Sequence, residues 1–146
     1  MAAPRRPESV LVVVYTDDRH VLLLKRVTPF DFWQSVTGSL DPGETHAETA
    51  RRELFEETGL TDEGCLVNTG IRRTFTIDPR WQHKYGPGMT ENVEYEWRYR
   101  LPAQVDIAAD PGEHSESAWS PLDEAIELVW SWTNRQALEN LKADLR

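Results

Sequence analysis

The segment that most constrains this chain spans residues 38–60 and reads GSLDPGETHAETARRELFEETGL. Thr45 and Glu48 have the spacing of a capping box, which predicts a helix that begins directly after Thr45. Gly59 predicts the end of that helix, because glycine readily takes the left-handed conformation that ends many helices. A turn-forming Asp-Pro-Gly run at residues 41–43 precedes the cap. The segment therefore predicts a loop that leads into a helix.

The predicted helix gathers acids on one face. At about 100° per residue, Glu53, Glu56 and Glu57 share a stripe beside the packing face. Like charges three and four residues apart cost an isolated helix roughly 0.2–0.5 kcal/mol per pair, so folding alone does not require them. A hard divalent cation would neutralise several such carboxylates at once. The alternative is a solvated acidic face with Arg51 and Arg52 as surface partners.

The complete pattern of the segment resembles the Nudix box. The defining positions are Gly38, Glu44, Arg52, Glu53, Leu54, Glu56, Glu57, Gly59 and Leu60. With average residue usage, a chance match in a chain of this length is on the order of one in tens of millions. The resemblance implies a single α/β domain over residues 1–146, a Nudix-type α/β/α sandwich with a mixed central sheet.

The resemblance also implies a role for each acid. The expected metal ligands and catalytic residues are Glu53, Glu56, Glu57 and Glu113. The backbone carbonyl of Gly38 is a further expected ligand, and the expected metal is Mg²⁺, with Mn²⁺ as the alternative. Glu113 comes from a later loop, where Glu116 competes with it. The base that takes a proton from water is one of Glu53, Glu56 and Glu113, and their spacing does not decide which.

Three residues of the box are expected to be structural. Arg52 lies four residues before Glu56 on the predicted helix and is expected to orient it. Glu44 is a structural rather than a catalytic candidate, and Gly59 ends the helix.

Composition limits the choice of partners. The 146 residues carry a net charge of −9, which argues against a nucleic acid polymer as partner. A polyphosphate substrate would therefore depend on metal ions and a local basic patch. Cys65 is the single cysteine, no apolar run has the length of a membrane span, and the stretch behind the first residues is too short for a signal peptide. A cytoplasmic location is the expectation, and the oligomeric state stays open.

Alternating and β-branched patterns predict the strands. Strands are expected at residues 8–15, 19–26, 33–37, 65–77, 91–101 and 117–119. The first two form a hairpin, and residues 65–77 form one strand or two. In the strand at residues 91–101 the glutamates are expected to face solvent.

Two helices are expected near the end of the chain. Ser120 has the position of an N-cap, with Pro121 as the first helical residue. The last helix is expected to begin near Thr133, where Gln136 completes a capping-box pattern.

The residues that select a substrate are expected outside the box. They are Arg5, Arg26, Thr37, Arg80, Ser131 and Trp132. Arg26 ends a strand that can aim its guanidinium at a phosphate, and Arg80 belongs to a loop at residues 78–90 that mixes basic and aromatic side chains. Thr37 replaces part of the Pro-Gly-Gly run of many family members, which suggests a hydrogen bond to substrate or, equally, packing under the helix. Trp132 is a candidate ring platform, and Ser131 a hydrogen-bond donor.

The resemblance implies hydrolysis of a small-molecule diphosphate or triphosphate. The segments RRPESVLVVVY, DFWQSVTGS, YGPGMTENVE and SWTNRQALE are similar to Nudix enzymes that convert dihydroneopterin triphosphate to the monophosphate and pyrophosphate in folate biosynthesis. One alternative is a broader nucleoside triphosphate pyrophosphatase. Another is a Nudix-fold sensor that binds a ligand without turnover, although the intact box favours an enzyme.

Overall fold

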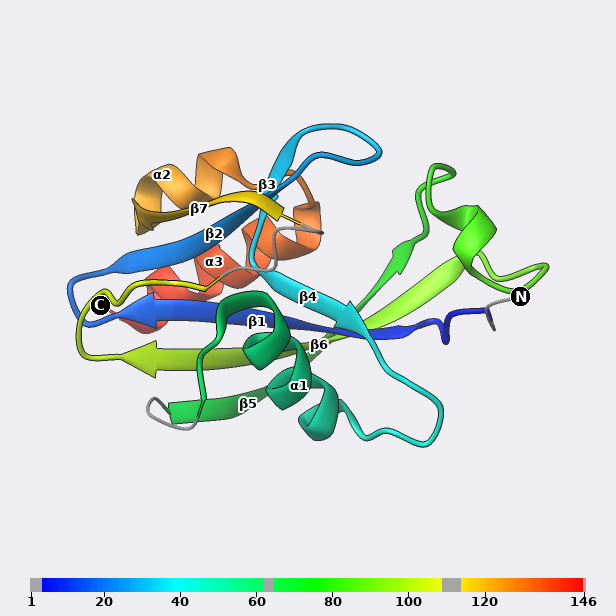
Figure 1. The fold of residues 1–146 in the computed structure, drawn as a ribbon, viewed down its shortest axis with the longest axis horizontal. Coiled ribbons are helices and arrows are strands. Elements are labelled where there is room, and N and C mark those ends of the chain that lie inside the picture. The colour runs from blue at the N-terminus through cyan, green and yellow to red at the C-terminus, as the bar shows by residue number, and fades with distance from the viewer. Residues whose placement is uncertain (1–3, 62–64, 109–113, 146) are drawn as a thin grey trace.

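A mixed sheet forms the middle layer of the structure (Figure 1). The computed structural model describes residues 4–61, 65–108 and 114–145, and within these ranges the sheet has seven strands. The strands are β1 (Glu8–Thr16), β2 (His20–Arg26), β3 (Phe32–Gln34), β4 (Val36–Ser39), β5 (Cys65–Thr76), β6 (Glu91–Leu101) and β7 (His114–Pro121). The helices are α1 (His46–Thr58), α2 (Leu122–Leu128) and α3 (Trp132–Asp144), with a short 3₁₀ helix η1 (Gln82–Lys84).

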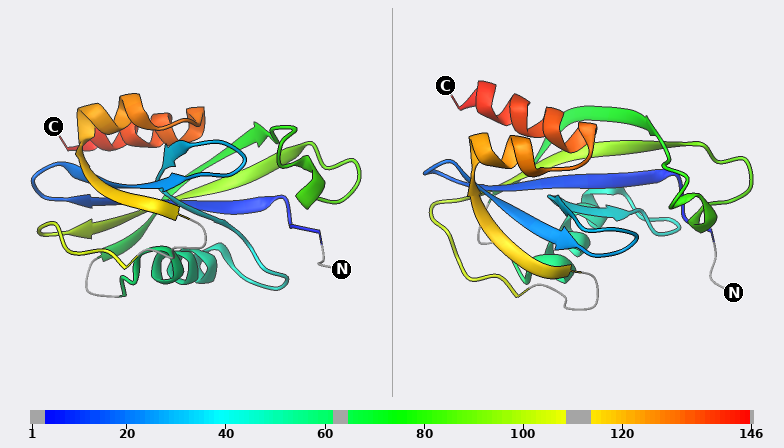
Figure 2. Two further views of the ribbon diagram at one scale, coloured as in Figure 1. Left: turned by 45° about the horizontal axis from the view of Figure 1, so that its top comes forward. Right: turned by 90° about the horizontal axis from the view of Figure 1, so that it is seen from above.

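Helices cover both faces of the sheet, so the predicted α/β/α sandwich is confirmed (Figure 2). Helix α1 lies on one face, where Leu54 packs with Val10 and Val12 of β1. Helices α2 and α3 lie on the other face, where Leu138 packs with Leu11. Because successive side chains of a strand point to opposite faces, β1 is buried on both sides and reads as a continuous apolar run.

The sheet divides at β1, and this division positions the site. The first half of β1 pairs with β4, with Val10 opposite Gly38. Strand β2 joins the far end of β1 through Tyr15 and Val21 and pairs in turn with β3 and β7 (Figure 1). Along its other edge β1 runs parallel to β6. The two parts of the sheet therefore separate beside the first half of β1.

Helix α1 has the predicted ends. The Thr45 hydroxyl accepts a hydrogen bond from the backbone N–H of Glu48, and the Glu48 carboxylate accepts one from the backbone N–H of Thr45. Gly59 follows the helix with a φ of 77°, and its N–H donates to the Phe55 carbonyl. The capping box and the glycine stop are confirmed, and they determine which residues of α1 face the sheet.

The strand expected at residues 33–37 is interrupted at Ser35. The backbone N–H of Ser35 donates to Oδ1 of Asn134 at 2.8 Å, and the Asn134 amide donates to the Ser35 hydroxyl at 2.9 Å. This buried exchange takes Ser35 out of the sheet, so β3 and β4 pair with different strands. Residues 65–76 form one continuous strand, β5.

The caps of the last two helices differ from the prediction. Ser120 is still paired with β2, so Pro121 takes the cap position of α2 and Ser120 does not. Ser131 caps α3, because its hydroxyl accepts a hydrogen bond from the backbone N–H of Asn134 at 3.1 Å. Thr133 therefore lies inside α3, and its hydroxyl does not cap the helix. No helix in the described ranges is long and apolar enough to cross a membrane.

Two of the three glutamates of β6 do not face solvent as predicted, whereas Glu91 is exposed. Glu94 is 6% exposed and Glu96 is 1% exposed. Both lie on the sheet face that α3 covers, because Glu94 is paired with Ser9 and Glu96 with Leu11 of β1. The prediction was wrong because an alternating strand shows two chemically different faces but does not show whether a helix covers the polar one.

Candidate active site

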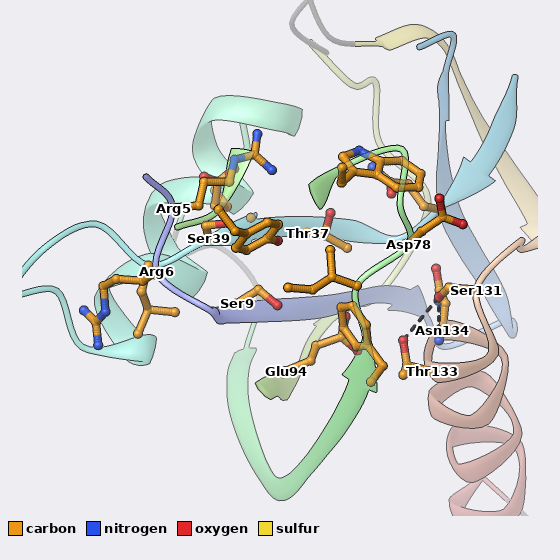
Figure 3. A pocket seen from close by; sticks show the side chains of 18 of the residues that line it. Arg5, Arg6, Ser9, Thr37, Ser39, Asp78, Glu94, Ser131, Thr133 and Asn134 are labelled. Carbon is orange, nitrogen blue, oxygen red and sulfur yellow. Dashed lines mark hydrogen bonds between the residues drawn. The ribbon is translucent and has the colours of Figure 1, made fainter. Parts of the chain in front are cut away.

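A cavity of about 730 Å³ lies where the two parts of the sheet separate (Figure 3). This volume is typical of sites for small-molecule ligands. Seven of the residues singled out in the sequence line it: Arg5, Arg26, Thr37, Gly38, Glu53, Ser131 and Trp132. The fold therefore brings the expected metal-binding segment and most of the expected substrate residues to one hollow.

Gly38 and Glu53 are in close contact at the wall of this cavity. A methyl group placed on Gly38 would lie less than 3.0 Å from the carboxyl carbon of Glu53. Gly38 is not among the glycines with positive φ, so the close approach of the side chain, rather than the backbone conformation, requires glycine here. The contact joins β4 to the first acid of the predicted ligand set.

Arg52 holds the acids of the box together. Its guanidinium donates to Glu44 at 2.8 and 2.9 Å, to Glu53 at 2.7 Å, and to the Ser39 carbonyl at 3.1 Å. The contact with Glu56 is also present but longer, at 3.3 Å. Hydrogen bonds from Arg52 lower the pKa of Glu44 to about 2. Glu44 is thus a permanently charged anchor for Arg52, in keeping with the structural role expected for it.

Glu53 and Glu57 form a buried pair of carboxyl groups. Glu57 is 1% exposed and hydrogen-bonds Glu53. Burial raises the pKa of Glu53 above its usual value, against the opposing effect of Arg52. On the far side of Glu57, His114 lies 3.3 Å away through its Nε2 atom. Two carboxyl groups in contact favour a shared proton or a shared cation.

The donor set fits a hard divalent cation. Glu53, Glu57 and the backbone of Gly38 lie together and offer only oxygen atoms, which Mg²⁺ and Mn²⁺ prefer. Glu56, with a side chain 53% exposed, reaches the same group from the rim through Arg52. In the part of the chain that the structure describes, no three acids, histidines or cysteines are grouped as a closed metal site.

Arginines bring positive charge to the cavity. Arg5 and Arg6 come from the segment before β1, and Arg26 ends β2. The backbone N–H of Arg5 donates to the Lys84 carbonyl at 2.8 Å, which ties this segment to the loop before β6. Arg6 is paired with Glu8 at 2.6 Å, so Arg5 and Arg26 are the candidates for the local basic patch that an acidic protein needs to hold a polyphosphate.

The start of α3 forms the opposite wall. Figure 3 shows Arg5 and Arg6 on one side of the cavity and Ser131 and Thr133 on the other. The Ser131 hydroxyl caps α3 and lies 3.2 Å from the Thr133 hydroxyl. Trp132 is 53% exposed at the rim, where its ring has room to stack on a planar group.

Arg80 does not line the cavity. Its guanidinium donates to the Asp78 carboxylate at 2.8 and 2.9 Å and lies 4.1 Å from the centre of the Phe30 ring. Its neighbours Asp78 and Trp81 line the cavity instead. The loop at residues 78–90 therefore contributes to the site, but through other side chains than the predicted one.

Of the two late acids, Glu113 lies outside the described residues. Its competitor Glu116 is exposed on β7, where its carboxylate accepts a hydrogen bond from Lys25 at 3.3 Å.

Two site residues were missed by the sequence analysis. His114, which begins β7, contacts Glu57, and Glu94 lines the cavity from β6. A lone histidine after a turn carries no signal in the sequence. Glu94 had a signal in the sequence, because Asn92, Glu94 and Glu96 alternate with apolar residues. The last helix is amphipathic, so its apolar side has to cover one face of the sheet, and that face can be the one that carries these polar residues.

The fold and the carboxylate-lined cavity define a hydrolase of the Nudix type. The NUDIX domain matches residues 5–141, so the chain belongs to the NUDIX family. Nudix hydrolases generally need a divalent metal and act on small phosphate-containing molecules.

Within the family, the chain is similar to two enzymes that carry the same name. It is 39% identical to the dihydroneopterin triphosphate diphosphatase of Escherichia coli K12 over 139 residues, which cover 92% of this chain and 91% of that protein. The enzyme of the same name from Haemophilus influenzae is 35% identical, over 95% of this chain and 89% of its own. The structure of the E. coli dihydroneopterin triphosphate pyrophosphohydrolase superimposes with a TM-score of 0.91 and 37% identity, covering 98% of this chain and 99% of the other.

Proposed function

We propose that this protein hydrolyses dihydroneopterin triphosphate to dihydroneopterin monophosphate and pyrophosphate, with Mg²⁺ as its metal. The observation that carries the proposal is the likeness to two dihydroneopterin triphosphate diphosphatases over nearly the whole chain. The parts outside the box that line the cavity are the segment before β1, the loop before β6 and the start of α3, and the superposition with the E. coli enzyme covers 98% of the chain. A cytoplasmic location remains part of the proposal.

The cavity suggests how the substrate lies. The triphosphate would lie between the arginines and Glu53, because Arg5 and Arg26 can donate to phosphate oxygens there. The pterin would lie toward the start of α3, with Trp132 beside its ring. Thr37 lies between these regions on β4 and can donate its hydroxyl to the substrate.

The reaction is the addition of water to a phosphorus atom with cleavage of the anhydride bond to the leaving pyrophosphate. A bound Mg²⁺ would supply charge neutralisation on the phosphate oxygens and a lowered pKa for bound water. Glu53, Glu56 and Glu57 would hold it, together with the Gly38 carbonyl. The proton of the attacking water would pass to a carboxylate, and Glu53, Glu56 and Glu113 stay the candidates for that base.

The test is product analysis with a panel of triphosphates and Mg²⁺. We expect pyrophosphate from dihydroneopterin triphosphate with a higher kcat/KM than from any ordinary nucleotide. A far higher kcat/KM for dATP would favour the broader nucleoside triphosphate pyrophosphatase, and no turnover of any member would favour a sensor.

A matched pair of variants separates chemistry from folding. Glu57→Gln should lower kcat by orders of magnitude, because Glu57 is a buried member of the ligand set. Glu139→Gln changes an exposed acid of α3 and should leave kcat unchanged. Equal rates for the two variants, with equal melting temperatures, would contradict the metal-binding role of Glu57.

A further inference from the structure

A buried acid with an unsatisfied oxygen lies on the wall of the cavity. Glu94 is 6% exposed, and its Oε1 atom has no hydrogen-bond partner within the described ranges of the chain. Its carboxyl group is hydrogen-bonded by the side chain of Thr133 at the start of α3. A buried polar atom without a partner costs about 1–3 kcal/mol, so its retention calls for a function.

Glu94 is not part of the neighbouring buried ion pair. Arg73 donates to Glu96 at 2.8 Å and to the side chain of Gln136. Glu96 lies also 3.8 Å from the guanidinium of Arg98. Arg73 attracts Glu94 through its charge, but its guanidinium donates its hydrogen bonds to Glu96 and Gln136, so Glu94 is not its hydrogen-bond partner.

The carboxylate oxygens of Glu94 can accept hydrogen bonds from the N–H groups of a ligand. An ionised carboxylate only accepts hydrogen bonds, and its two oxygens can accept from two adjacent donors. Burial raises the pKa of Glu94 to about 7, so the group readily exists in either form near neutral pH. Glu94 lies next to Thr133, on the α3 side of the cavity, where the proposed orientation puts the ring of the substrate (Figure 3).

We propose that Glu94 selects the substrate by accepting hydrogen bonds from the ring N–H and the adjacent amino group of a 2-amino-4-oxopyrimidine ring. Pterins and guanine share this edge, whereas hypoxanthine lacks its amino group and adenine lacks both donors. Thr133 is a positioning residue, since it holds the carboxyl group toward the cavity. The inference rests on the proposed function for the orientation of the substrate and adds the group that recognises its ring.

GTP and ITP provide the matched probes, because they differ only in the 2-amino group. Their dissociation constants are measured by calorimetry with Ca²⁺ in place of Mg²⁺ to slow turnover. The protein should bind GTP about 10–100-fold more tightly than ITP, which is the size of effect expected when a buried acceptor loses its donor. Equal affinity for the two nucleotides, or no binding of either, would overturn the proposal.

Glu94→Gln is the variant that tests the residue itself. The amide keeps the shape of the carboxylate but presents its own N–H₂ group to the ligand, so the GTP-to-ITP ratio should fall to about 1. Glu91→Gln removes an exposed acid of the same strand and should keep the wild-type ratio. A Glu94→Gln protein that retains the wild-type ratio would refute the assignment.

A second variant covers the case in which Glu94→Gln does not fold. Glu94→Asp keeps the charge but withdraws the carboxylate by one methylene, so it should weaken GTP binding more than ITP binding without reversing the preference. Unchanged binding of both nucleotides would count against the proposal.

Failure of the inference is distinguishable from failure of the proposed function. Turnover of dihydroneopterin triphosphate is measured separately with Mg²⁺. If the wild type does not hydrolyse the pterin but its GTP preference depends on Glu94, the function fails and the recognition stands. If the wild type hydrolyses the pterin and Glu94→Gln keeps the GTP preference, the proposed function stands and the role of Glu94 in recognition fails.

Discussion

Replacement of Gly38 by alanine tests whether the contact between β4 and α1 serves catalysis. The added methyl group would lie less than 3.0 Å from the carboxyl carbon of Glu53. An ordinary contact between carbon atoms needs about 3.5–4.0 Å, so the carboxylate has to move by more than about 1 Å. Because it is the end of a flexible side chain, it can move without unfolding the protein.

The expected result is a loss of activity with little loss of stability. A displacement of about 1 Å at reacting groups can lower a rate by about 100-fold. We therefore expect Gly38→Ala to lower kcat for pyrophosphate release by about 100-fold with dihydroneopterin triphosphate and Mg²⁺. The melting temperature should change little, since the φ of Gly38 is not positive.

Gly86→Ala is the matched control for this experiment. The methyl group added at Gly86 would meet Met89 and Pro4 at 3.9 Å, which is an ordinary contact, and its φ is not positive either. Gly86→Ala should keep wild-type kcat. If Gly38→Ala keeps kcat within a few-fold of the wild type, the position of the Glu53 carboxylate does not control the reaction, and the reasoning from this contact is refuted.

Three further predictions concern stability and the metal. Arg73→Met should lower the free energy of unfolding in urea by about 3–5 kcal/mol, because it leaves Glu96 charged and buried; a double variant that adds Glu96→Met should recover much of this loss, and additive losses would argue against a coupled pair. Arg52 lowers the pKa of Glu44 from 4.5 to about 2, so Glu44 should stabilise the fold by about 3 kcal/mol above pH 4.5, and this contribution should disappear as the pH falls toward 2. A Glu44→Gln variant should therefore be less stable than the wild type at pH 7 and approach it at low pH, whereas a constant difference would contradict the pKa argument. Removal of divalent metal with EDTA should abolish pyrophosphate release, and excess Mg²⁺ should restore it; full activity in EDTA would exclude the proposed metal dependence.

The strongest local patterns were the ones read correctly. The cap at Thr45 and the stop at Gly59 depend on hydrogen bonds and backbone angles within a few residues, so neighbouring residues suffice to predict them. The caps of α2 and α3 were predicted one and two residues away from where they form. Ser120 is held in β7 by its pairing with β2, and a partner on a distant strand cannot be seen in local sequence.

One expected substrate residue, Arg80, does not line the cavity, for a related reason. Arg80 has the chemistry of a phosphate ligand, but Asp78, two residues before it, takes its guanidinium. The basic and aromatic composition of the loop indicated a binding region without indicating which side chains face the cavity. For Arg80 the nearby acid Asp78 decides this, because the turn places its carboxylate within reach of the guanidinium.

The sequence by itself determined the chemistry of the box. The spacing of Glu53, Glu56 and Glu57 on one helix is a local property, and the helix period places them on one stripe wherever the helix packs. The tertiary structure alone decided which other groups join them. Glu94 was read as a solvent-facing residue because only the packing of α3 over β6 buries it, and His114 reaches Glu57 because β7 begins beside α1. Residues far apart in the chain meet through packing, and that packing carries no local signal.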